Sequence, residues 1–212
     1  MIIQLLVDNP NSWIISYLEK LKEEIIIKFS FSINLIYKHE DVKNGDILVL
    51  LSCIKMFKHL NLNTHNLVIH ESDLPKGRGM SPLTWQILEG KSDIPVTLLE
   101  ASEELDAGVI YGQKVMELNG SELVDELRDL QFKVTKNLII DFLDNYSNIQ
   151  GVSQDGTPTF YRARNINDSK LDISKSIEEQ FNLFRISDNI RYPAWFEKNG
   201  FKYKLEINKI KE

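Results

Sequence analysis

Short apolar runs that recur through the first two thirds of the chain constrain its fold more than any other feature. Runs of roughly four to eight apolar residues are typical of strands buried in a parallel sheet. Stretches with apolar residues at helical spacing lie between them, and such alternation indicates a sheet covered on both faces. We therefore predict an α/β fold with a mostly parallel sheet, whose strands are residues 2–7, 32–37, 47–51, 67–69, 95–100 and 109–116.

Three stretches are predicted to form helices around this sheet. The first covers residues 12–25 and places its apolar side chains on one face. The second covers residues 80–88, with Ser81 as N-cap and Pro82 at the first helical position, where a missing N–H costs nothing. The third is a long helix over residues 121–142, which we expect to begin at a Ser121 cap.

A polar, turn-rich segment at residues 145–156 indicates a boundary. We predict a core of residues 1–147 and a C-terminal extension of residues 148–212 that packs on it. The extension is expected to hold a small helix and a β-hairpin, because Asn-Gly is a favoured hairpin turn. The predicted elements of the extension are a short strand at residues 159–164, a helix at 174–186 and a hairpin at 194–207 that turns at Asn199-Gly200. The core has one further predicted element, a short helix or turn at residues 54–60.

Charge and composition exclude several classes of protein. The 212 residues carry a formal net charge of −6, so a broad basic surface for nucleic acid is not expected. The single cysteine, Cys53, rules out an internal disulfide and fits a reducing compartment. The N-terminus lacks the basic start of a signal peptide, and no apolar run approaches the roughly 20 residues of a membrane span. We expect a cytoplasmic protein without a membrane partner.

Several catalytic and binding motifs are missing. The first strand is followed by Asp8-Asn9-Pro10 instead of the glycine-rich turn of a dinucleotide site. There is neither a Walker-type phosphate loop nor a Gly-x-Ser-x-Gly nucleophile elbow. The four histidines do not pair with cysteine or carboxylate at metal-ligand spacing, so we predict no metal site.

His70 and Asp106 are the residues that we expect to carry chemistry. His70 ends one predicted strand and Asp106 follows another, and 106 − 70 = 36 residues is about one strand-helix-strand unit. Neighbouring parallel strands would bring them together at the carboxyl edge of the sheet, where ligands bind. A carboxylate beside a histidine favours the imidazolium, which can donate to a developing oxyanion. The alternative is that His70 is a structural hydrogen-bonding group and Asp106 an ordinary turn residue.

Two sequence blocks resemble the formyltransferases that use 10-formyltetrahydrofolate. His70-Glu-Ser-Asp-Leu-Pro-Lys-Gly-Arg-Gly-Met-Ser-Pro is similar to the family's His-x-Ser-Leu-Leu-Pro-x-x-Arg-Gly-x-x-Pro signature, and Val96-Thr-Leu with Leu105-Asp-Ala-Gly is similar to its second block. The resemblance covers residues 46–118 strongly. It implies the Rossmann-like formyltransferase fold, with 10-formyltetrahydrofolate as cosubstrate.

The C-terminal part resembles that of short nucleotide-sugar N-formyltransferases. Arg191-Tyr-Pro-Ala-Trp-Phe lies in this part, and the Ser-Asp-Leu-Pro-Lys-Gly-Arg-Gly variant is most similar to enzymes of pseudaminic-acid-type pathways. The resemblance implies a UDP-linked 4-amino-4,6-dideoxy sugar as substrate. Length and acidity fit a methionyl-tRNA formyltransferase poorly. A formyltetrahydrofolate hydrolase and a non-catalytic binder stay open as alternatives, and the apolar hairpin could serve a homodimer.

The resemblance also assigns roles to individual residues. His70 and Asp106 are the expected catalytic pair. One departure concerns the family's Asn-x-His, because Val68 stands at the position of the asparagine, and Asn66 is separated from His70 by strand residues. The expected cofactor-binding residues are Cys53, Ile54, Met56, Ser72, Asp73, Leu74, Pro75, Leu99, Glu100, Ala101 and Ser102, and the expected substrate-binding residues are Lys76, Arg78, Arg191, Tyr192 and Trp195.

Overall fold

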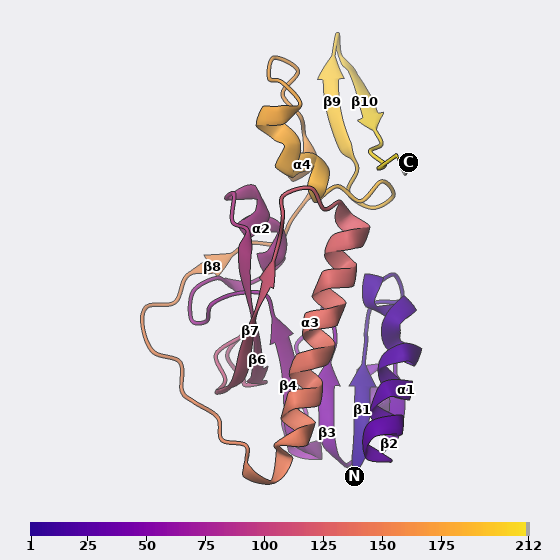
Figure 1. Cartoon of the computed structure of the whole chain (residues 1–212), viewed down its shortest axis with the longest axis vertical. Helices are drawn as coiled ribbons and strands as arrows, with labels where there is room; N and C mark the ends of the chain where they lie inside the picture. The colour runs from indigo at the N-terminus through magenta and orange to yellow at the C-terminus, as the bar shows by residue number, and fades with distance from the viewer. Residues whose placement is uncertain (211–212) are drawn as a thin grey trace.

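A six-stranded sheet forms the centre of the protein in a computed structural model that describes residues 1–210. The strand order is β2-β1-β3-β4-β6-β7 (Figure 1). The first four of these strands are parallel, whereas β6 is antiparallel to β4 and β7 is antiparallel to β6. The prediction of a mostly parallel α/β sheet is confirmed. The strands are β1 (Ile2–Leu6), β2 (Ser32–Ile36), β3 (Gly45–Leu50), β4 (Asn63–His70), β6 (Asp93–Glu100) and β7 (Ile110–Glu117).

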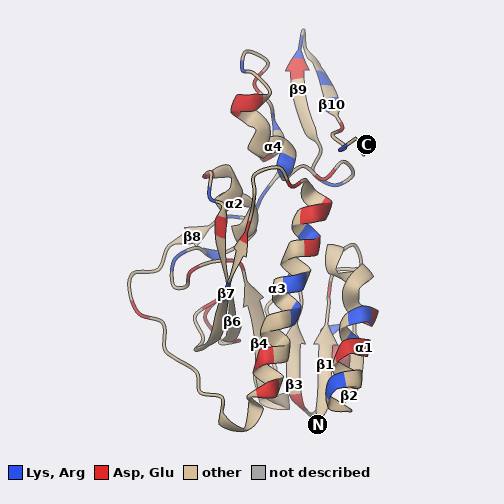
Figure 2. Cartoon of the chain, viewed as in Figure 1, with Lys and Arg blue, Asp and Glu red and all other residues tan. Residues whose placement is uncertain are grey.

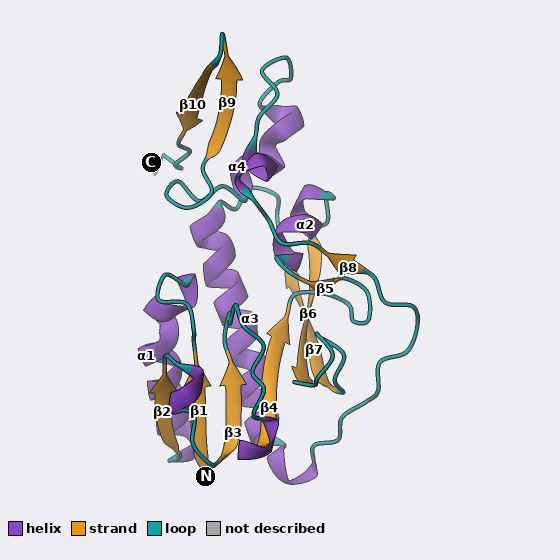
Figure 3. Ribbon diagram, turned by 180° about the vertical axis from the view of Figure 1, so that it is seen from behind, coloured by secondary structure: helices purple, strands orange, loops and turns teal. Residues whose placement is uncertain are grey.

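The helices cover one face of this sheet. α1 (Leu18–Phe29), α2 (Pro82–Leu88) and α3 (Val124–Asp144) all contribute side chains to a single buried cluster with Leu5 and Val49 of the sheet. Figure 1 shows α1 and α3 in front of the strands, and Figure 3 shows the opposite face. No helix of the described residues is long and apolar enough to cross a membrane.

The opposite face is covered by loops and single helical turns. Its smaller buried cluster contains Leu6, Leu48 and Leu50 of the sheet together with Phe57 and Val42 from the loops. The segment predicted as a short helix or turn, residues 54–60, is a loop with bends at its start, and it runs into the helical turn η3 (Leu60–Leu62). The sheet is therefore covered on both faces, as predicted, but by helices on one face and by loops on the other. Because loops replace helices here, space remains for a pocket at the carboxyl ends of β3 and β4.

Of the two predicted helix caps, Ser81 stands at the N-cap position of α2 without a capping hydrogen bond, and Ser121 was wrong. Ser81 precedes α2 but has a left-handed backbone, with φ of 56°, and its hydroxyl caps nothing. Pro82 does occupy the start of α2, as predicted. α3 begins at Val124, three residues after Ser121, and the Glu126 carboxylate accepts the backbone N–H of Leu123 at 2.9 Å.

Ionic contacts connect α1 to α3, and basic and acidic side chains are interspersed along both helices (Figure 2). Lys136 lies 2.8 Å from Glu24, and Lys28 pairs with Asp144. Exposed pairs of this kind contribute little each, roughly 0–1 kcal/mol.

The C-terminal extension holds a short helix and a hairpin. The helix predicted at 174–186 is shorter, with a turn η6 (Glu178–Gln180) followed by α4 (Phe181–Arg185). β9 (Ala194–Lys198) and β10 (Phe201–Leu205) form the predicted antiparallel hairpin. Asn199 and Gly200 both have positive φ, 53° and 79°, as a two-residue hairpin turn requires.

A long segment, residues 149–161, returns from the end of α3 to the sheet, and we call it the strap. It is the loop that runs to β8 (Phe160–Tyr161) in Figure 1. β8 pairs in parallel with β5 (Arg78–Gly79), a pairing that the sequence did not predict. The strap thereby fixes the loop that follows His70 to a segment more than 70 residues away in the chain.

Candidate active site

A pocket that is partly open to solvent lies at the carboxyl ends of β3 and β4. Its apolar wall includes Ile54, Met56, Val68 and Leu99. His70 and Asp106 line the same pocket. The loops after β3 and β6 thus border a partly apolar space that also holds titratable side chains, among them His70 and Asp106, which is the usual composition of a ligand site.

His70 and Asp106 lie side by side. Nδ1 of His70 is 3.6 Å from Oδ2 of Asp106, and both side chains are less than 10% exposed. Nε2 of His70 is 2.8 Å from the carbonyl of Gly77 and must carry a hydrogen, since a carbonyl can only accept. The remaining nitrogen, Nδ1, faces the carboxylate and the pocket. Because 3.6 Å is longer than a hydrogen bond, a proton on Nδ1 is free to reach a ligand oxygen beside the carboxylate.

The route by which Asp106 reaches His70 differs from the predicted one. β4 and β6 are antiparallel, and His70 pairs with Thr97. Asp106 lies in the loop between β6 and β7 and reaches His70 because this loop turns back. Its φ of 53° is a strained backbone conformation for a residue with a side chain, and Gly79 N–H donates to its Oδ2 at 2.8 Å. The argument from parallel neighbours was therefore wrong, although the two residues do meet.

Gly108 completes the turn of this loop. A Cβ at that position would lie 1.8 Å from the carbonyl oxygen of Glu100, so a larger residue cannot fit without moving the backbone. The Leu105-Asp-Ala-Gly block is thus explained by packing as well as by chemistry.

The predicted cofactor-binding residues fall into two groups. Seven of them line the pocket, namely Cys53, Ile54, Met56, Leu99, Glu100, Ala101 and Ser102. The other four, Ser72, Asp73, Leu74 and Pro75, form the loop after His70, in which Ser72, Leu74 and Pro75 are buried and the Leu74-Pro75 peptide is cis. Burial raises the pKa of the Cys53 thiol to about 12, so this side chain lines the wall as a neutral group.

The predicted substrate-binding residues are scattered. Lys76 is exposed on the loop. Arg78 is buried, and its guanidinium pairs with Glu104 at 2.7 Å and Gln154 at 2.8 Å. Arg78 is thus held within the protein instead of facing solvent.

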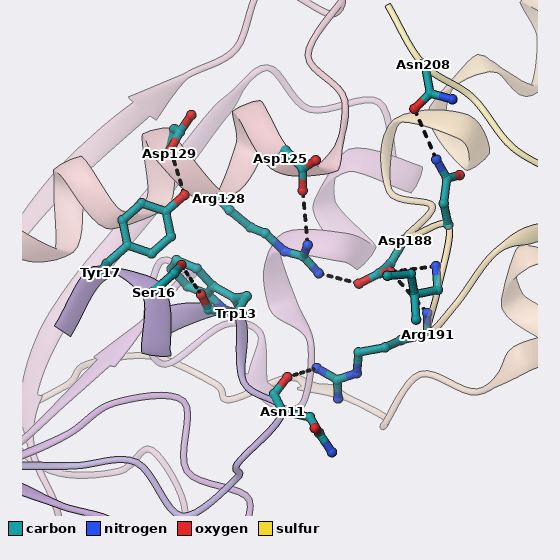
Figure 4. Close-up of polar contacts among 12 residues, drawn as sticks. Asn11, Trp13, Ser16, Tyr17, Asp125, Arg128, Asp129, Asp188, Arg191 and Asn208 are labelled. Atoms are coloured by element: carbon teal, nitrogen blue, oxygen red, sulfur yellow. Dashed lines mark hydrogen bonds and ion pairs between the residues drawn. The ribbon is translucent and has the colours of Figure 1, made fainter.

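The other three lie in the extension and are not part of the pocket lining. Arg191 is exposed, and its Nη1 donates to the carbonyl of Asn11 at 2.8 Å (Figure 4). Tyr192 lies beside the guanidinium of Arg164, with 5.0 Å from ring centre to Cζ. Trp195 is buried, and its indole N–H donates to the carbonyl of Ile166.

Asn66 does not replace the missing family asparagine. Its amide nitrogen donates to the carbonyl of Leu60 at 2.8 Å, and its backbone carbonyl accepts the N–H of Ala101. Its side chain is 3% exposed and is held on the strand, four residues before His70. Val68 lines the pocket with an apolar side chain.

Two residues near the pair were missed by sequence reasoning. Gln154 of the strap donates to the carbonyl of Asp106, and nothing in its turn-rich sequence indicated this contact. Glu71, next to His70, hydrogen-bonds the amide of Gln131 on α3. Burial raises the pKa of Glu71, and the nearby His70 opposes that rise. Glu71 lies within the signature block that begins at His70, and this position was the feature of the sequence that could have indicated its place near the pair.

Asp8, His39 and Cys53 form a cluster that the fold brings together from separate segments. Sequence spacing could not reveal it. Asp8 accepts the N–H groups of Ile54 and Lys55 at 2.7 and 2.9 Å and lies 3.0 Å from Nε2 of His39. The Cys53 thiol donates to the carbonyl of Leu6. Each potential ligand atom already has a protein partner, so we interpret the cluster as the anchor of the loop that forms the pocket wall.

Comparison with known proteins places this site in a family. Residues 40–143 match the formyl transferase family, and the chain belongs to it. A methionyl-tRNA formyltransferase of Thermotoga neapolitana is 33% identical over 168 residues, which are 76% of this chain and 53% of that protein. The chain spans about half the length of the curated relatives it matches.

Solved structures share the fold over nearly the whole chain. A sugar N-formyltransferase from Shewanella has a TM-score of 0.73 at 18% identity and covers 100% of this chain and 99% of its own. HypX from Aquifex aeolicus, solved in complex with tetrahydrofolic acid, has a TM-score of 0.82 at 17% identity and covers 97% of this chain and 37% of its own. At these identities the likeness concerns the fold.

Proposed function

We propose that the protein is an N-formyltransferase that moves the formyl group of 10-formyltetrahydrofolate to the amine of a nucleotide-linked amino-deoxy sugar. The acceptor that we favour is a UDP-linked 4-amino-4,6-dideoxy sugar. The observation that carries the proposal is the buried His70–Asp106 pair, 3.6 Å apart, at the wall of an apolar pocket in a chain of the formyl transferase family.

The residues of the pocket fit a folate. Ile54, Met56 and Leu99 give an apolar wall for a flat ring system, and Glu100, Ala101 and Ser102 follow the end of β6 with polar groups beside it. Ser72 to Pro75 shape the loop beside His70, and Lys76, Arg78, Arg191, Tyr192 and Trp195 stay candidates for the acceptor side. Of these, Lys76 and Arg191 have exposed cationic groups.

The geometry suggests a division of labour in the transfer. Bound 10-formyltetrahydrofolate supplies an activated formyl carbon. The neutral acceptor amine forms a new C–N bond to that carbon while the bond from the carbon to N10 breaks. His70, as the imidazolium with a proton on Nδ1 as well as on Nε2, donates its Nδ1–H to the formyl oxygen, where negative charge develops. Asp106 accepts a proton from the attacking amine, and that proton passes to N10 as the bond from the formyl carbon to N10 breaks, so that tetrahydrofolate leaves neutral at N10. Val68 contributes no donor, so His70 has a larger share of oxyanion stabilisation.

The acceptor is chosen on two supports. Sugar N-formyltransferases share this fold with coverage of both whole chains, and the formal net charge of −6 does not favour a broad basic surface for tRNA. A second candidate is methionyl-tRNA, because the curated relatives carry that activity in their names. A formyltetrahydrofolate hydrolase would use the same pair with water as nucleophile, and a non-catalytic binder would show ligand affinity without turnover.

A homodimer is a further part of the proposal. The hairpin exposes Phe201, Tyr203 and Leu205 on β10, with 68%, 47% and 38% of each side chain accessible. Apolar side chains gathered on an edge strand are typical of an association surface. Sedimentation of the protein, with Phe201→Ser as the comparison, would measure this.

Acceptor screening tests the proposed function. The protein is incubated with 10-formyltetrahydrofolate and, separately, UDP-, dTDP- and GDP-linked amino sugars and charged initiator tRNA. We expect a gain of one formyl group, measured by mass spectrometry, on a UDP-linked amino sugar. Formylation of the tRNA alone would transfer the assignment to the second candidate. Release of tetrahydrofolate without any amine requirement would identify a hydrolase, and tight folate binding with no turnover a binder.

A further inference from the structure

The strap is anchored on both sides of the catalytic pair. Near its start, Val152 exchanges two backbone hydrogen bonds of 2.8 Å with Ile110 of β7. Near its end, Thr159 and Tyr161 accept the N–H groups of Arg78 and Met80 at 2.9 and 3.0 Å. The segment between these anchors therefore lies across the loop that carries Asp106 and the loop that follows His70.

Gln154 lies in this middle segment and uses its whole side-chain amide. Its Nε2 donates to the carbonyl of Asp106 at 2.8 Å and to that of Gly108 at 2.9 Å. Its Oε1 accepts from Nη2 and Nε of Arg78, at 2.8 and 3.2 Å. A single side chain thus connects the β6–β7 loop to the loop after His70.

Arg78 also contacts the β6–β7 loop directly. Its Nη1 pairs with Glu104, two residues before Asp106, at 2.7 Å. The backbone N–H of the next residue, Gly79, donates to the Asp106 carboxylate. Gln154 therefore fixes Asp106 through its backbone carbonyl, and Gly79 fixes it through its carboxylate. Arg78 connects these two contacts, because its guanidinium bonds Gln154 and its backbone continues directly into Gly79.

Asp106 needs such fixing because of its backbone conformation. A non-glycine residue at φ of 53° costs of order 1 kcal/mol or more and persists only where the surroundings determine it. The hydrogen bonds from Gln154 to the carbonyls of Asp106 and Gly108 favour this strained backbone conformation over an extended one. Without them the loop can relax and move the carboxylate away from Nδ1 of His70.

We propose that Gln154 is a positioning residue for formyl transfer, which holds the Asp106 loop in the geometry that the His70–Asp106 pair needs. This inference rests on the proposed function of that pair. Gln154 is not one of the residues that line the pocket, and its contact with the catalytic pair is the hydrogen bond to the carbonyl of Asp106, so it acts through Asp106. The role requires an amide, because one end must donate to two carbonyls while the other accepts from a guanidinium.

The substitution Gln154→Glu tests the donor end of the amide separately from its acceptor end. It keeps the shape and the contact with Arg78 but removes both donors and places a carboxylate oxygen against two carbonyls. We expect kcat for transfer from 10-formyltetrahydrofolate to the UDP-linked 4-amino-4,6-dideoxy sugar to fall about 10- to 100-fold, as for a misplaced catalytic group. KM for 10-formyltetrahydrofolate should change by less than about threefold, because the apolar wall is unchanged.

A readout without any acceptor accompanies this assay. Hydrogen–deuterium exchange of the Gly79 N–H and of residues 101–110 should speed up in Gln154→Glu and in Gln154→Met. Gln150→Glu is the matched control, since it makes the same change at an exposed position of the same strap. It should leave both the exchange and kcat at their wild-type values. All variants are compared at a temperature at which their melting curves show folded protein.

The outcomes separate the two proposals. A kcat within twofold of wild type and unchanged exchange in Gln154→Glu, with transfer abolished in Asp106→Asn, would overturn the role of Gln154 and leave the pair intact. Wild-type transfer by Asp106→Asn would overturn the pair and with it the role of Gln154. An equal loss in Gln150→Glu would mean that any acidic change in the strap has the effect, which also contradicts the proposal.

Discussion

The pocket end of the core and the C-terminal extension are held by different kinds of contact. Around the pocket, hydrogen bonds that involve the backbone dominate. The Gly77 carbonyl accepts from His70, the Gly79 N–H donates to the Asp106 carboxylate, and Gln154 donates to the carbonyl of Asp106. Residues 162–207, which follow the strap, are joined to the core by ion pairs, of which Arg185–Glu122 at 2.8 Å is buried, and by the side chain of Ile186, which packs in the main apolar cluster. We therefore expect formyl transfer to depend on the core and the strap more than on residues 162–207.

The largest expected effect breaks the core side of this comparison. His70→Asn or Asp106→Asn should lower kcat for formyl transfer roughly 10²- to 10⁴-fold, because a positioned acid or base contributes that much. Tetrahydrofolate release and melting curves measure activity and folding together. His59→Asn is the matched control, since His59 is exposed and lies outside the pocket lining. Near-normal turnover in His70→Asn would remove the imidazole from the mechanism.

The next effect breaks the extension side. Arg185→Ala leaves Glu122 as a buried carboxylate without its cation, and we expect the free energy of unfolding to fall by about 3–5 kcal/mol. Chemical denaturation measures it. Lys170→Ala removes the exposed partner of Glu197 and should cost less than about 1 kcal/mol. An equal fall in the free energy of unfolding in the two variants would show that the buried Arg185–Glu122 pair contributes no more to stability than the exposed pair.

A pH dependence sharpens the same contact. Burial alone would raise the pKa of Glu122, but the N–H of Asn119 and the Arg185 guanidinium hold it below its usual 4.5. A lowered pKa in the folded state stabilises the fold above the unfolded pKa, and this contribution is lost as pH falls below about 4.5 towards the folded value. Each pKa unit corresponds to about 1.4 kcal/mol.

Glu122→Gln is the variant that isolates this titration. We expect it to have a flatter dependence of unfolding free energy on pH below about 4.5 than wild type. Asp188, whose pKa is likewise lowered by Arg128 and by the N–H groups of Arg191 and Ile190 against the effect of burial, retains its own dependence. Identical slopes in wild type and Glu122→Gln would contradict the assignment.

The smallest effect concerns the hairpin. Gly200 has φ of 79° and no atom within 4 Å of an added Cβ, so Gly200→Ala should cost about 1 kcal/mol from backbone strain alone. Gly79→Ala is the contrasting variant, because its Cβ would lie 2.3 Å from the carbonyl oxygen of Tyr161. We expect Gly79→Ala to reduce both stability and transfer, and Gly200→Ala to leave transfer unchanged. Thermal melting and the transfer assay distinguish the two.

The sequence predicted most of the sheet because each strand is a compact apolar run. It did not predict the direction of β6, since an apolar run such as Val96–Leu99 reads the same in either direction. Ser121 was mistaken for a cap, and Ser81 stands at the N-cap position without a capping hydrogen bond, because residue type indicates a capping bond only where the backbone takes the required geometry. The short α4 was overestimated for a similar reason: its flanks are held by side chains such as Gln180, which a helical pattern does not reveal.

The candidate site was predictable where chemistry and local sequence coincide. His70 and Asp106 each lie in a motif with its own turn residues, and the structure brings them together. Gln154 was not predictable, because its partners Asp106 and Gly108 are more than 45 residues away and bind it through backbone carbonyls, which leave no trace in sequence. Arg78 was assigned to the acceptor for its charge, and only the fold reveals that Glu104 and Gln154 occupy its guanidinium.

The most direct test of the account is a crystal structure of the protein with tetrahydrofolate and the UDP-linked amino sugar. We expect the ring system of the folate against Leu99 and Ile54, its N10 within about 4 Å of the His70 imidazole, and the sugar amine between N10 and the Asp106 carboxylate. A folate bound outside this pocket would contradict the account, as would an amine that faces away from His70 and Asp106.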